Sequence, residues 1–179
     1  MGEFDQVLSA AQAGAEWAIG RLYCDLNPAV LRFLTARAGD AGEDLAQETW
    51  IGVARGLAAF SGDERGFRSW VFTIAHRRLV QRWRDLERRP STPIDPEDLG
   101  TLAGGADPAA SVVADAAAAD LVAGLTAEQA EVVLLRVVGG FEAAEVGQII
   151  GKSAGAVRII QHRALKRLAE RFATESVTP

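Results

Sequence analysis

The pattern of apolar positions along this chain is that of α-helices, with apolar side chains recurring every three or four residues. The first such stretch runs from Phe4 to about Arg37, and Pro28 is expected to open a further segment within it. Its apolar stripe consists of Val7, Leu8, Ala11, Ala15, Ala18, Ile19 and Leu22. Alanine and leucine dominate and runs of β-branched residues are absent, which favours helix over strand. We therefore predict an all-α protein.

A second helix is predicted over residues 43–55, after a turn at 39–42. Asp44, Gln47 and Glu48 share one of its faces because they are spaced by three and four, while Leu45 faces away with Thr49. An acidic and amide-bearing face beside an apolar seam suits the docking of a basic partner. An ordinary solvated face has the same pattern.

The third stretch, residues 67–89, is apolar in its first half and strongly basic in its second. It follows a polar, glycine-containing loop at 60–66, carries six arginines against two acids near its end, and is stopped by Pro90. Such a helix presents guanidinium groups to an extended polyanion. Trp70 and Trp83 add flat surfaces on which an unstacked base can lie. The alternative is a solvated basic helix that only packs through its apolar stripe.

The C-terminal part has the start and stop signals of three helices. Thr126 is a good N-cap for the first, which a glycine pair ends at 139–140. The next two, at 143–150 and from 154 to about 172, are joined by a turn at 151–153, which is the helix-turn-helix pattern. One face of the last helix is apolar (Val157, Ile160, Ala164, Leu168) and the other basic (Arg158, His162, Arg163, Lys166). A recognition helix in a DNA major groove has this arrangement.

Between these blocks the sequence is that of a linker, rich in proline and glycine from residue 90 to about 110. Eight acids and no lysine or arginine lie between Arg89 and Arg136. We predict two small helical domains at 1–89 and 114–179, joined by a flexible acidic linker at 90–113. The net charge of −5 does not exclude a DNA partner, because the local charge of a face matters more than the total.

The single cysteine, Cys24, excludes an internal disulfide framework and fits a reducing compartment. The N-terminus lacks the pattern of a signal peptide, and no apolar run is long enough to cross a bilayer. We expect a soluble, cytoplasmic protein that makes no membrane contact by itself.

Three motifs in order resemble an extracytoplasmic-function sigma factor of bacterial RNA polymerase, a group of the sigma-70 family. They are Asp44-Leu45-x-Gln47-Glu48, the run from Phe67-Arg68-Ser69-Trp70 to Ala75, and Gly155-Ala156-Val157-Arg158 followed by His162-Arg163-Ala164. The match covers nearly the whole chain, linker included. Each motif alone is only weakly specific for the family, but the three together, in order and at the spacing of the family, are specific.

The resemblance implies a protein that binds core RNA polymerase at its clamp and flap regions and directs promoter recognition. In the family, the first domain melts the minus-ten element and the second reads the minus-thirty-five element. Carried onto this chain, Asp44, Leu45, Gln47 and Glu48 bind the polymerase. The minus-ten set is Phe60, Asp63, Phe67, Trp70, His76, Arg77, Gln81 and Arg84. The minus-thirty-five set is Arg136, Lys152, Ser153, Arg158, Ile159, His162, Arg163 and Lys166. Members of the family commonly bind an anti-sigma protein, so the resemblance also implies an anti-sigma partner.

The chain departs from the family at several DNA-facing positions. Arg77 and Gln81 stand where asparagine and aspartate are common, Ala156 replaces the usual threonine, and Ile159 and Ile160 replace a common Ser-Arg pair. These departures bear on base preference at both promoter elements.

Neither catalysis nor a cofactor is predicted. His76 and His162 lie in different blocks without a ligand cluster, so no metal site is expected. Gly151-Lys152-Ser153 matches the end of a phosphate-binding loop, but the earlier glycine is out of register and a helix precedes it. Two rival functions remain: a stand-alone helix-turn-helix regulator, and a nucleic-acid enzyme, which needs clustered carboxylates.

Overall fold

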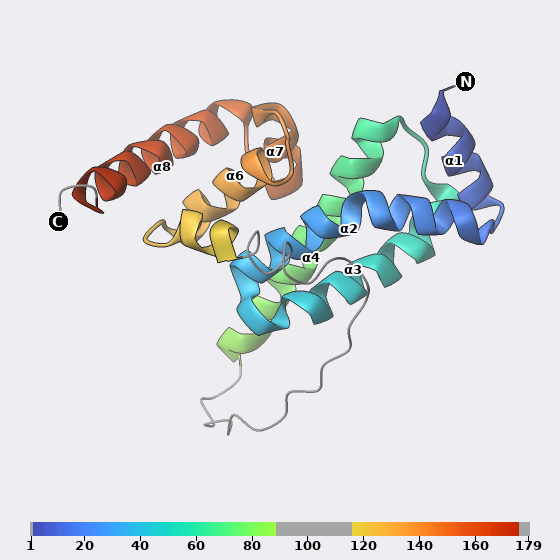
Figure 1. Ribbon diagram of the computed structural model, residues 1–179, viewed down its shortest axis with the longest axis horizontal. Coiled ribbons are helices and arrows are strands. Elements are labelled where there is room, and N and C mark those ends of the chain that lie inside the picture. Colours follow the sequence, from blue (N-terminus) through green and yellow to red (C-terminus); the bar gives the residue numbers. More distant parts are fainter. Residues whose placement is uncertain (1, 89–115, 176–179) are drawn as a thin grey trace.

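The computed structural model describes residues 2–88 and 116–175, and within these ranges it is helical without strands (Figure 1). The predicted all-α fold is confirmed. The helices are α1 (Glu3–Gln12), α2 (Glu16–Ala38), α3 (Gly42–Gly56), α4 (Glu64–Arg88), α6 (Ala127–Val137), α7 (Ala143–Ile150) and α8 (Ala154–Glu175). Two 3-10 turns, η1 (Gly39–Ala41) and η2 (Leu57–Ala59), flank α3. The predicted linker at 90–113 lies outside the described residues. No helix in the described ranges is both long and apolar enough to cross a membrane.

The first stretch of helix is divided at a different place from the one that the sequence predicts. The break falls between α1 and α2, where Gly14 takes a φ of +87° that favours glycine. Because the break resets the helical phase, Ile19 is 44% exposed and does not join the core stripe. The prediction that Pro28 opens a segment is also wrong, since α2 runs through it. A proline within a helix forfeits a backbone hydrogen bond, but Leu26 and Val30 on either side are buried, and their packing holds α2 together.

Helices α2, α3 and α4 pack against one another and form the core of the N-terminal half, residues 2–88. Phe33, Leu34 and Val71 are fully buried. Burying one such side chain contributes roughly 1.5–3 kcal/mol. Thr49 is buried as predicted, and its hydroxyl donates to the carbonyl oxygen of Leu45 at 2.7 Å. The polar face of α3 is thereby left outside.

The C-terminal half, residues 116–175, contains the predicted helix-turn-helix. Thr126 and Gln129 cap α6 reciprocally, through hydrogen bonds of 3.3 and 3.1 Å. Gly151 ends α7 with a left-handed φ of +73°, and the hydroxyl of Ser153 accepts the backbone N–H of Ala156 at 3.1 Å at the start of α8. Val157, Ala164 and Leu168 are buried and Ile160 packs against the core. The apolar face of α8 is therefore confirmed.

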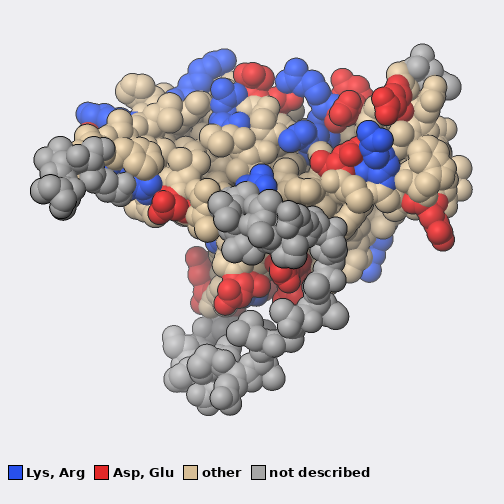
Figure 2. Space-filling model, viewed as in Figure 1, with Lys and Arg blue, Asp and Glu red and all other residues tan. Residues whose placement is uncertain are grey.

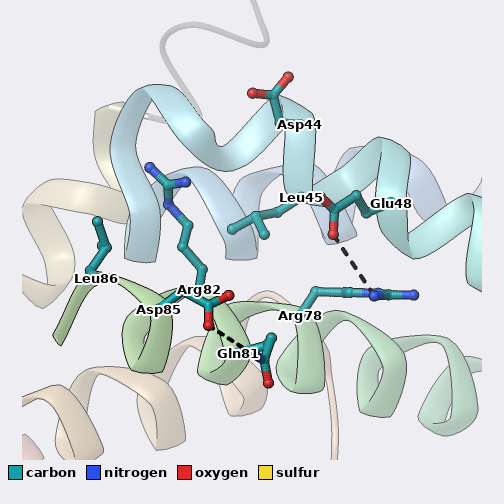
Figure 3. A pocket seen from close by; sticks show the side chains of 8 residues that line it. All are labelled: Asp44, Leu45, Glu48, Arg78, Gln81, Arg82, Asp85 and Leu86. Carbon is teal, nitrogen blue, oxygen red and sulfur yellow. Dashed lines mark hydrogen bonds and ion pairs between the residues drawn. The ribbon is translucent and has the colours of Figure 1, made fainter. Parts of the chain in front are cut away.

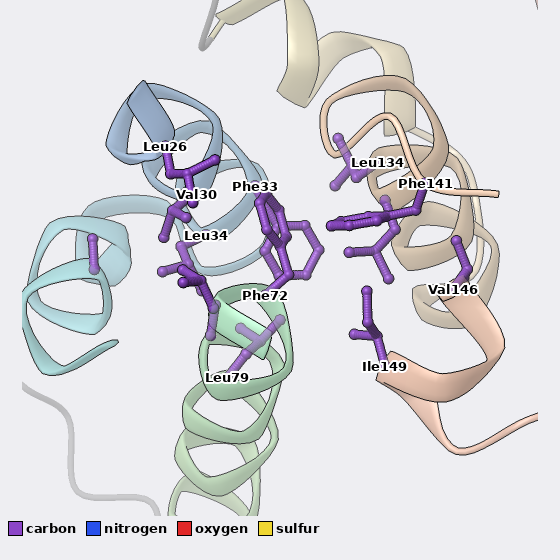
Figure 4. Packing of buried hydrophobic residues seen from close by; sticks show 14 of the residues in the cluster. Leu26, Val30, Phe33, Leu34, Phe72, Leu79, Leu134, Phe141, Val146 and Ile149 are labelled. Atoms are coloured by element: carbon purple, nitrogen blue, oxygen red, sulfur yellow. The ribbon is translucent and has the colours of Figure 1, made fainter. Parts of the chain in front are cut away.

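The two halves share one continuous core, which the sequence does not predict. Phe72 of α4 lies between Phe33 of α2 and Phe141, which precedes α7 (Figure 4). Its ring meets that of Phe141 edge-on, with centroids 5.0 Å apart. Leu134 and Val146 complete the seam from the C-terminal side and are fully buried.

Candidate nucleic-acid and polymerase interface

A polar groove of about 220 Å³ runs between α3 and α4 (Figure 3). Glu48 forms its upper wall and pairs with Arg78 of α4 at 3.9 Å. Leu45 is 4% exposed, so it closes the floor from within the core. Asp44 also lines the groove, with its carboxylate directed away from α4. The remaining lining residues, all from α4, are Gln81, Arg82, Asp85 and Leu86.

The acidic and amide face predicted on α3 is present. Asp44, Gln47 and Glu48 are exposed, and the Glu48 side chain, 56% exposed, has a loose contact with its arginine. An exposed pair at this distance contributes little, at most about 1 kcal/mol. The carboxylates are consequently available to another positively charged partner.

The basic half of α4 presents its cations to solvent. Arg77, Arg82 and Arg84 are exposed, and Gln81 donates to Asp85 one turn away at 2.9 Å. Trp83 is not a free platform as the sequence suggested, because the guanidinium of Arg37 lies over its ring at 4.8 Å. Such a contact is a cation–π interaction.

An aromatic cluster stands at the other end of α4. Phe67 is 1% exposed and lies 5.3 Å from Phe60, 5.8 Å from Phe4 and 5.8 Å from Trp70, measured between ring centroids. Asp63 accepts the backbone N–H of Gly66 at 2.8 Å and so orders the loop that enters the helix. Phe60 and Trp70 are half-buried. Phe67 therefore supports these two rings from within.

His76 is turned away from the other residues of the predicted minus-ten set. Its Nε2 lies 2.9 Å from a carboxylate oxygen of Glu131 on α6, and the two form an ion pair when the imidazole is protonated. The two groups are not aligned for a hydrogen bond. Both side chains are largely buried, at 14% and 11% exposed. His76 thus faces the C-terminal half.

The basic face predicted on α8 is exposed. It carries Arg158, Ile159, His162, Arg163 and Lys166. Figure 2 shows basic side chains along the edge of the molecule that α8 forms. Ile159 is 56% exposed among these cations. This is the surface that the helix-turn-helix offers to a major groove.

The other members of the minus-thirty-five set have local partners. Arg136 donates to the carbonyl oxygen of Phe141 and lies 3.2 Å from the Glu142 carboxylate, so it braces the turn between α6 and α7. Lys152 pairs with Glu128 at 2.6 Å, and this hydrogen bond and charge raise the pKa of Lys152. Ser153 is used as the cap of α8.

Some residues of the site are absent from the sequence-based prediction. Arg78 and Arg82 line the groove, and their place in the arginine run was the only available signal. Glu131, a carboxylate 8% exposed on a helix of apolar residues, could have been flagged as a buried charge in need of a partner. Among the described residues there is no group of three His, Cys, Asp or Glu side chains that could hold a metal ion.

A cationic helix and a helix-turn-helix with an exposed basic face place this chain among the DNA-binding transcription proteins. The family model described as Sigma-70 region 2 matches residues 22–89, and that described as Sigma-70, region 4 matches residues 121–170. The chain therefore belongs to the sigma-70 family. Its similarity to curated sigma factors of the extracytoplasmic-function (ECF) group of bacterial RNA polymerase places it in that group, as its motifs predicted. It is a sigma factor, the class of protein that directs transcription initiation.

Relatives support this assignment over nearly the full length of this chain. The chain is 37% identical to the ECF RNA polymerase sigma factor ShbA of Streptomyces griseus, over 88% of this chain and 89% of that one. It is 31% identical to BldN of Streptomyces coelicolor, over 92% of this chain and 64% of the length of BldN. SigD of Mycobacterium tuberculosis is 30% identical, over 93% and 82%.

Two solved structures have the same fold. One is CnrH in complex with the cytosolic domain of CnrY, with a TM-score of 0.64 and 20% identity, covering 96% of this chain and 97% of that one. The other is the sigma factor RpoE in complex with the anti-sigma factor NepR from Bartonella quintana, with a TM-score of 0.63 and 23% identity, covering 84% and 94%.

Proposed function

We propose that this chain binds core RNA polymerase through α3, melts the minus-ten promoter element with α4 and its entering loop, and reads the minus-thirty-five element with α8. The observation that carries the proposal is the presence of two exposed cationic faces, on α4 and α8, together with an exposed acidic face on α3. A stand-alone repressor needs only one DNA-reading face and has no use for the other two.

For polymerase docking, Asp44, Gln47 and Glu48 offer carboxylate and amide oxygens to a basic surface. The Glu48 carboxylate forms one weak ion pair, with Arg78. A more strongly cationic surface of a partner has only this ion pair to displace. Leu45 acts from inside, by holding α3 against the core.

For the minus-ten element, Arg77, Gln81 and Arg84 contact the strand, and Phe60 and Trp70 offer half-buried rings to an unstacked base. Phe67 and Asp63 position these rings by packing and by ordering the loop. His76 joins this set only when it leaves Glu131.

For the minus-thirty-five element, Arg158, His162, Arg163 and Lys166 supply contacts to bases and phosphates. Ile159 supplies an apolar contact. Arg136, Lys152 and Ser153 act mainly by fixing the helix-turn-helix, since each is already engaged within it.

We further propose that an anti-sigma protein binds this chain, as in the RpoE–NepR complex. The setting for these contacts is the cytoplasm. The chemistry of RNA synthesis belongs to the polymerase, and this chain adds no catalytic group or cofactor of its own.

The test is reconstitution with core RNA polymerase. The tagged chain should capture core enzyme, and the mixture should give a run-off transcript from a cognate promoter selected from a random library. The chain without polymerase should bind the same duplex weakly. Tight, specific binding of the duplex by the chain alone, with no transcript in the presence of core enzyme, would favour the stand-alone regulator.

A further inference from the structure

The face of α4 that offers arginines to a nucleic acid also carries a carboxylate. At about 100° per residue, Arg77, Arg84 and Arg88 lie within about 40° of one another around the helix. Asp85 lies at one edge of the same face, where it lines the groove between α3 and α4. A negative charge at this place repels phosphate groups and weakens the attraction that the arginines provide. Attraction of DNA therefore does not explain the presence of Asp85.

The Asp85 carboxylate is engaged by the side-chain amide of Gln81. Nε2 of Gln81 donates a hydrogen bond to Oδ1 of Asp85 at 2.9 Å, across one turn of α4 (Figure 3). Residues four apart are neighbours on a helix surface, and a Gln–Asp pair at this spacing is favourable. Both residues are exposed. The hydrogen bond therefore lies on the surface that α4 offers to a binding partner.

This hydrogen bond decides which end of the Gln81 amide is free. The amide has an NH2 donor and a carbonyl oxygen acceptor, and rotating the group by about 180° exchanges them. An ionised carboxylate only accepts hydrogen bonds, so Asp85 must be met by the NH2 group. The amide oxygen is consequently directed away from Asp85, as Figure 3 shows. Gln81 presents a hydrogen-bond acceptor to a molecule that binds beside it.

The bases of DNA differ in the property that a fixed acceptor reads. On their major-groove edges, adenine and cytosine carry an exocyclic amino group that donates, whereas guanine and thymine carry carbonyl oxygens that accept. A freely rotating amide satisfies either kind of base by turning over. An amide whose oxygen is held outward accepts a hydrogen bond from an amino group and repels a carbonyl oxygen. Fixing the amide therefore makes an indifferent side chain selective.

We propose that Asp85 is a positioning residue, which orients Gln81 to select adenine or cytosine and to disfavour guanine or thymine at one position of the minus-ten element. Asp85 acts through Gln81 and does not itself contact the DNA. The inference rests on the proposed function, because it takes α4 as the reader of that element. It adds the class of base that Gln81 selects and the residue that sets this selectivity.

The first experiment tests the contact in the free protein by nuclear magnetic resonance. The side-chain NH2 group of Gln81 gives a pair of signals in the ¹⁵N-labelled protein, assigned by their loss in Gln81→Ala. Asp85→Ala should shift both signals. The matched control is Glu87→Ala, since Glu87 is also an exposed acid of α4 but lies about 120° around the helix from Gln81. Unmoved Gln81 signals in Asp85→Ala would overturn the proposal without any use of polymerase.

The second experiment is transcription from a promoter library with randomised minus-ten positions, using core polymerase with each form of the factor. The position that Gln81 reads is the one where Gln81→Ala loses the preference for adenine or cytosine. Asp85→Ala should reduce that preference about twofold, the scale of an exposed side-chain pair one helical turn apart. Glu87→Ala should leave the preference unchanged.

Promoter affinity and thermal stability separate this role from two simpler ones. Asp85→Ala and Glu87→Ala each remove one negative charge, so both should raise promoter affinity to a similar extent at low salt. Only Asp85→Ala should also lose selectivity. A merely structural role of Asp85 predicts a lower melting temperature with unchanged base preference.

Two rescue variants test whether the orientation of the amide is the cause. Asp85→Glu keeps a carboxylate one turn from Gln81 and should retain the preference. Gln81→Glu combined with Asp85→Ala should restore the preference for bases with an amino group, because both oxygens of a carboxylate accept and no orienting partner is needed.

Selection of the same bases with the same strength by the Asp85→Ala factor would overturn the proposal, as would a preference for guanine or thymine at the position read by Gln81. An unchanged selection by Gln81→Ala at every position would overturn it as well. Absence of any transcript from the unmodified factor with core polymerase would overturn the proposed function and this reading of bases with it, while the amide signals would still report the contact between Gln81 and Asp85.

Discussion

Ile159 offers the sharpest test of how this chain reads DNA. It is 56% exposed on α8 between Arg158 and the pair His162 and Arg163, whereas its neighbour Val157 is fully buried. Exposure of the isoleucine side chain to water contributes no favourable free energy at this position. Its methyl groups suit the C5-methyl of a thymine in the major groove. Ile159→Ser should therefore weaken the preference for thymine at one minus-thirty-five position.

The size of the effect follows from the area that remains to be buried. Complete burial of an isoleucine is worth roughly 1.5–3 kcal/mol, and about half of this residue's surface is still exposed. A single base contact covers only part of that surface, which leaves about 1 kcal/mol, or about a fivefold loss of preference. The fold should be unaffected within about 0.5 kcal/mol, because the side chain is exposed and Ile and Ser have similar helix propensities.

The assay is transcription from a promoter library with randomised minus-thirty-five positions, using polymerase that carries either form of the factor. Leu165→Ser is the matched control: Leu165 is 52% exposed on the same helix but lies about 240° further round it. Arg158→Ala should instead weaken binding broadly and reduce its salt dependence if the contact is to phosphate. Selection of the same sequences with the same strength by the Ile159→Ser factor would refute the methyl contact.

Three further predictions concern the docking face, the contact between the halves and the helix-turn-helix. Asp44→Arg with Glu48→Arg should abolish co-purification with core polymerase while the melting temperature changes little, because both side chains are exposed; undiminished co-purification would remove this face from the docking surface. Burial raises the pKa of Glu145, but the hydrogen bonds from its arginine partner on α4 and from the backbone outweigh this and hold the pKa below the ordinary 4.5. The contribution of this carboxylate to the contact between the halves is therefore complete above pH 4.5 and is lost as the pH falls through the lowered pKa. The melting temperature should therefore decline in acid, and Glu145→Gln should show less of this decline. Gly147→Ala should lower the melting temperature markedly, because an added Cβ would collide with the backbone carbonyl oxygen of Lys152 in the turn between α7 and α8. Gly155→Ala has free space and should be neutral or slightly stabilising. Equal melting temperatures of the two variants would contradict this view of the turn.

The sequence by itself determined the helices and the helix-turn-helix, because both depend on local information. Spacing of apolar residues and caps such as Thr126 and Ser153 act within a few residues. The polar face of α3 and the basic face of α8 follow from the same periodicity. The family motifs, which are also short and ordered along the chain, were sufficient for the assignment to the sigma factors.

Where local signals competed, the sequence misled. Pro28 normally ends a helix, but α2 continues through it because residues on both sides are buried against α3 and α4. Ile19 falls in the predicted apolar stripe only if the helix is continuous. The break at Gly14 changes the helical phase and takes Ile19 out of that stripe.

Only the tertiary structure decided which side chains of the basic and aromatic stretches are free. Trp83 is covered by Arg37, Phe67 lies within an aromatic cluster, and His76 meets Glu131. The contacts of Trp83 with Arg37, of Phe67 with Phe4 and of His76 with Glu131 each join residues more than forty positions apart on different helices. No periodicity within one helix can predict them. The shared core of the two halves has the same origin, because the fit of Phe72 against Phe141 depends on how two separately specified surfaces meet.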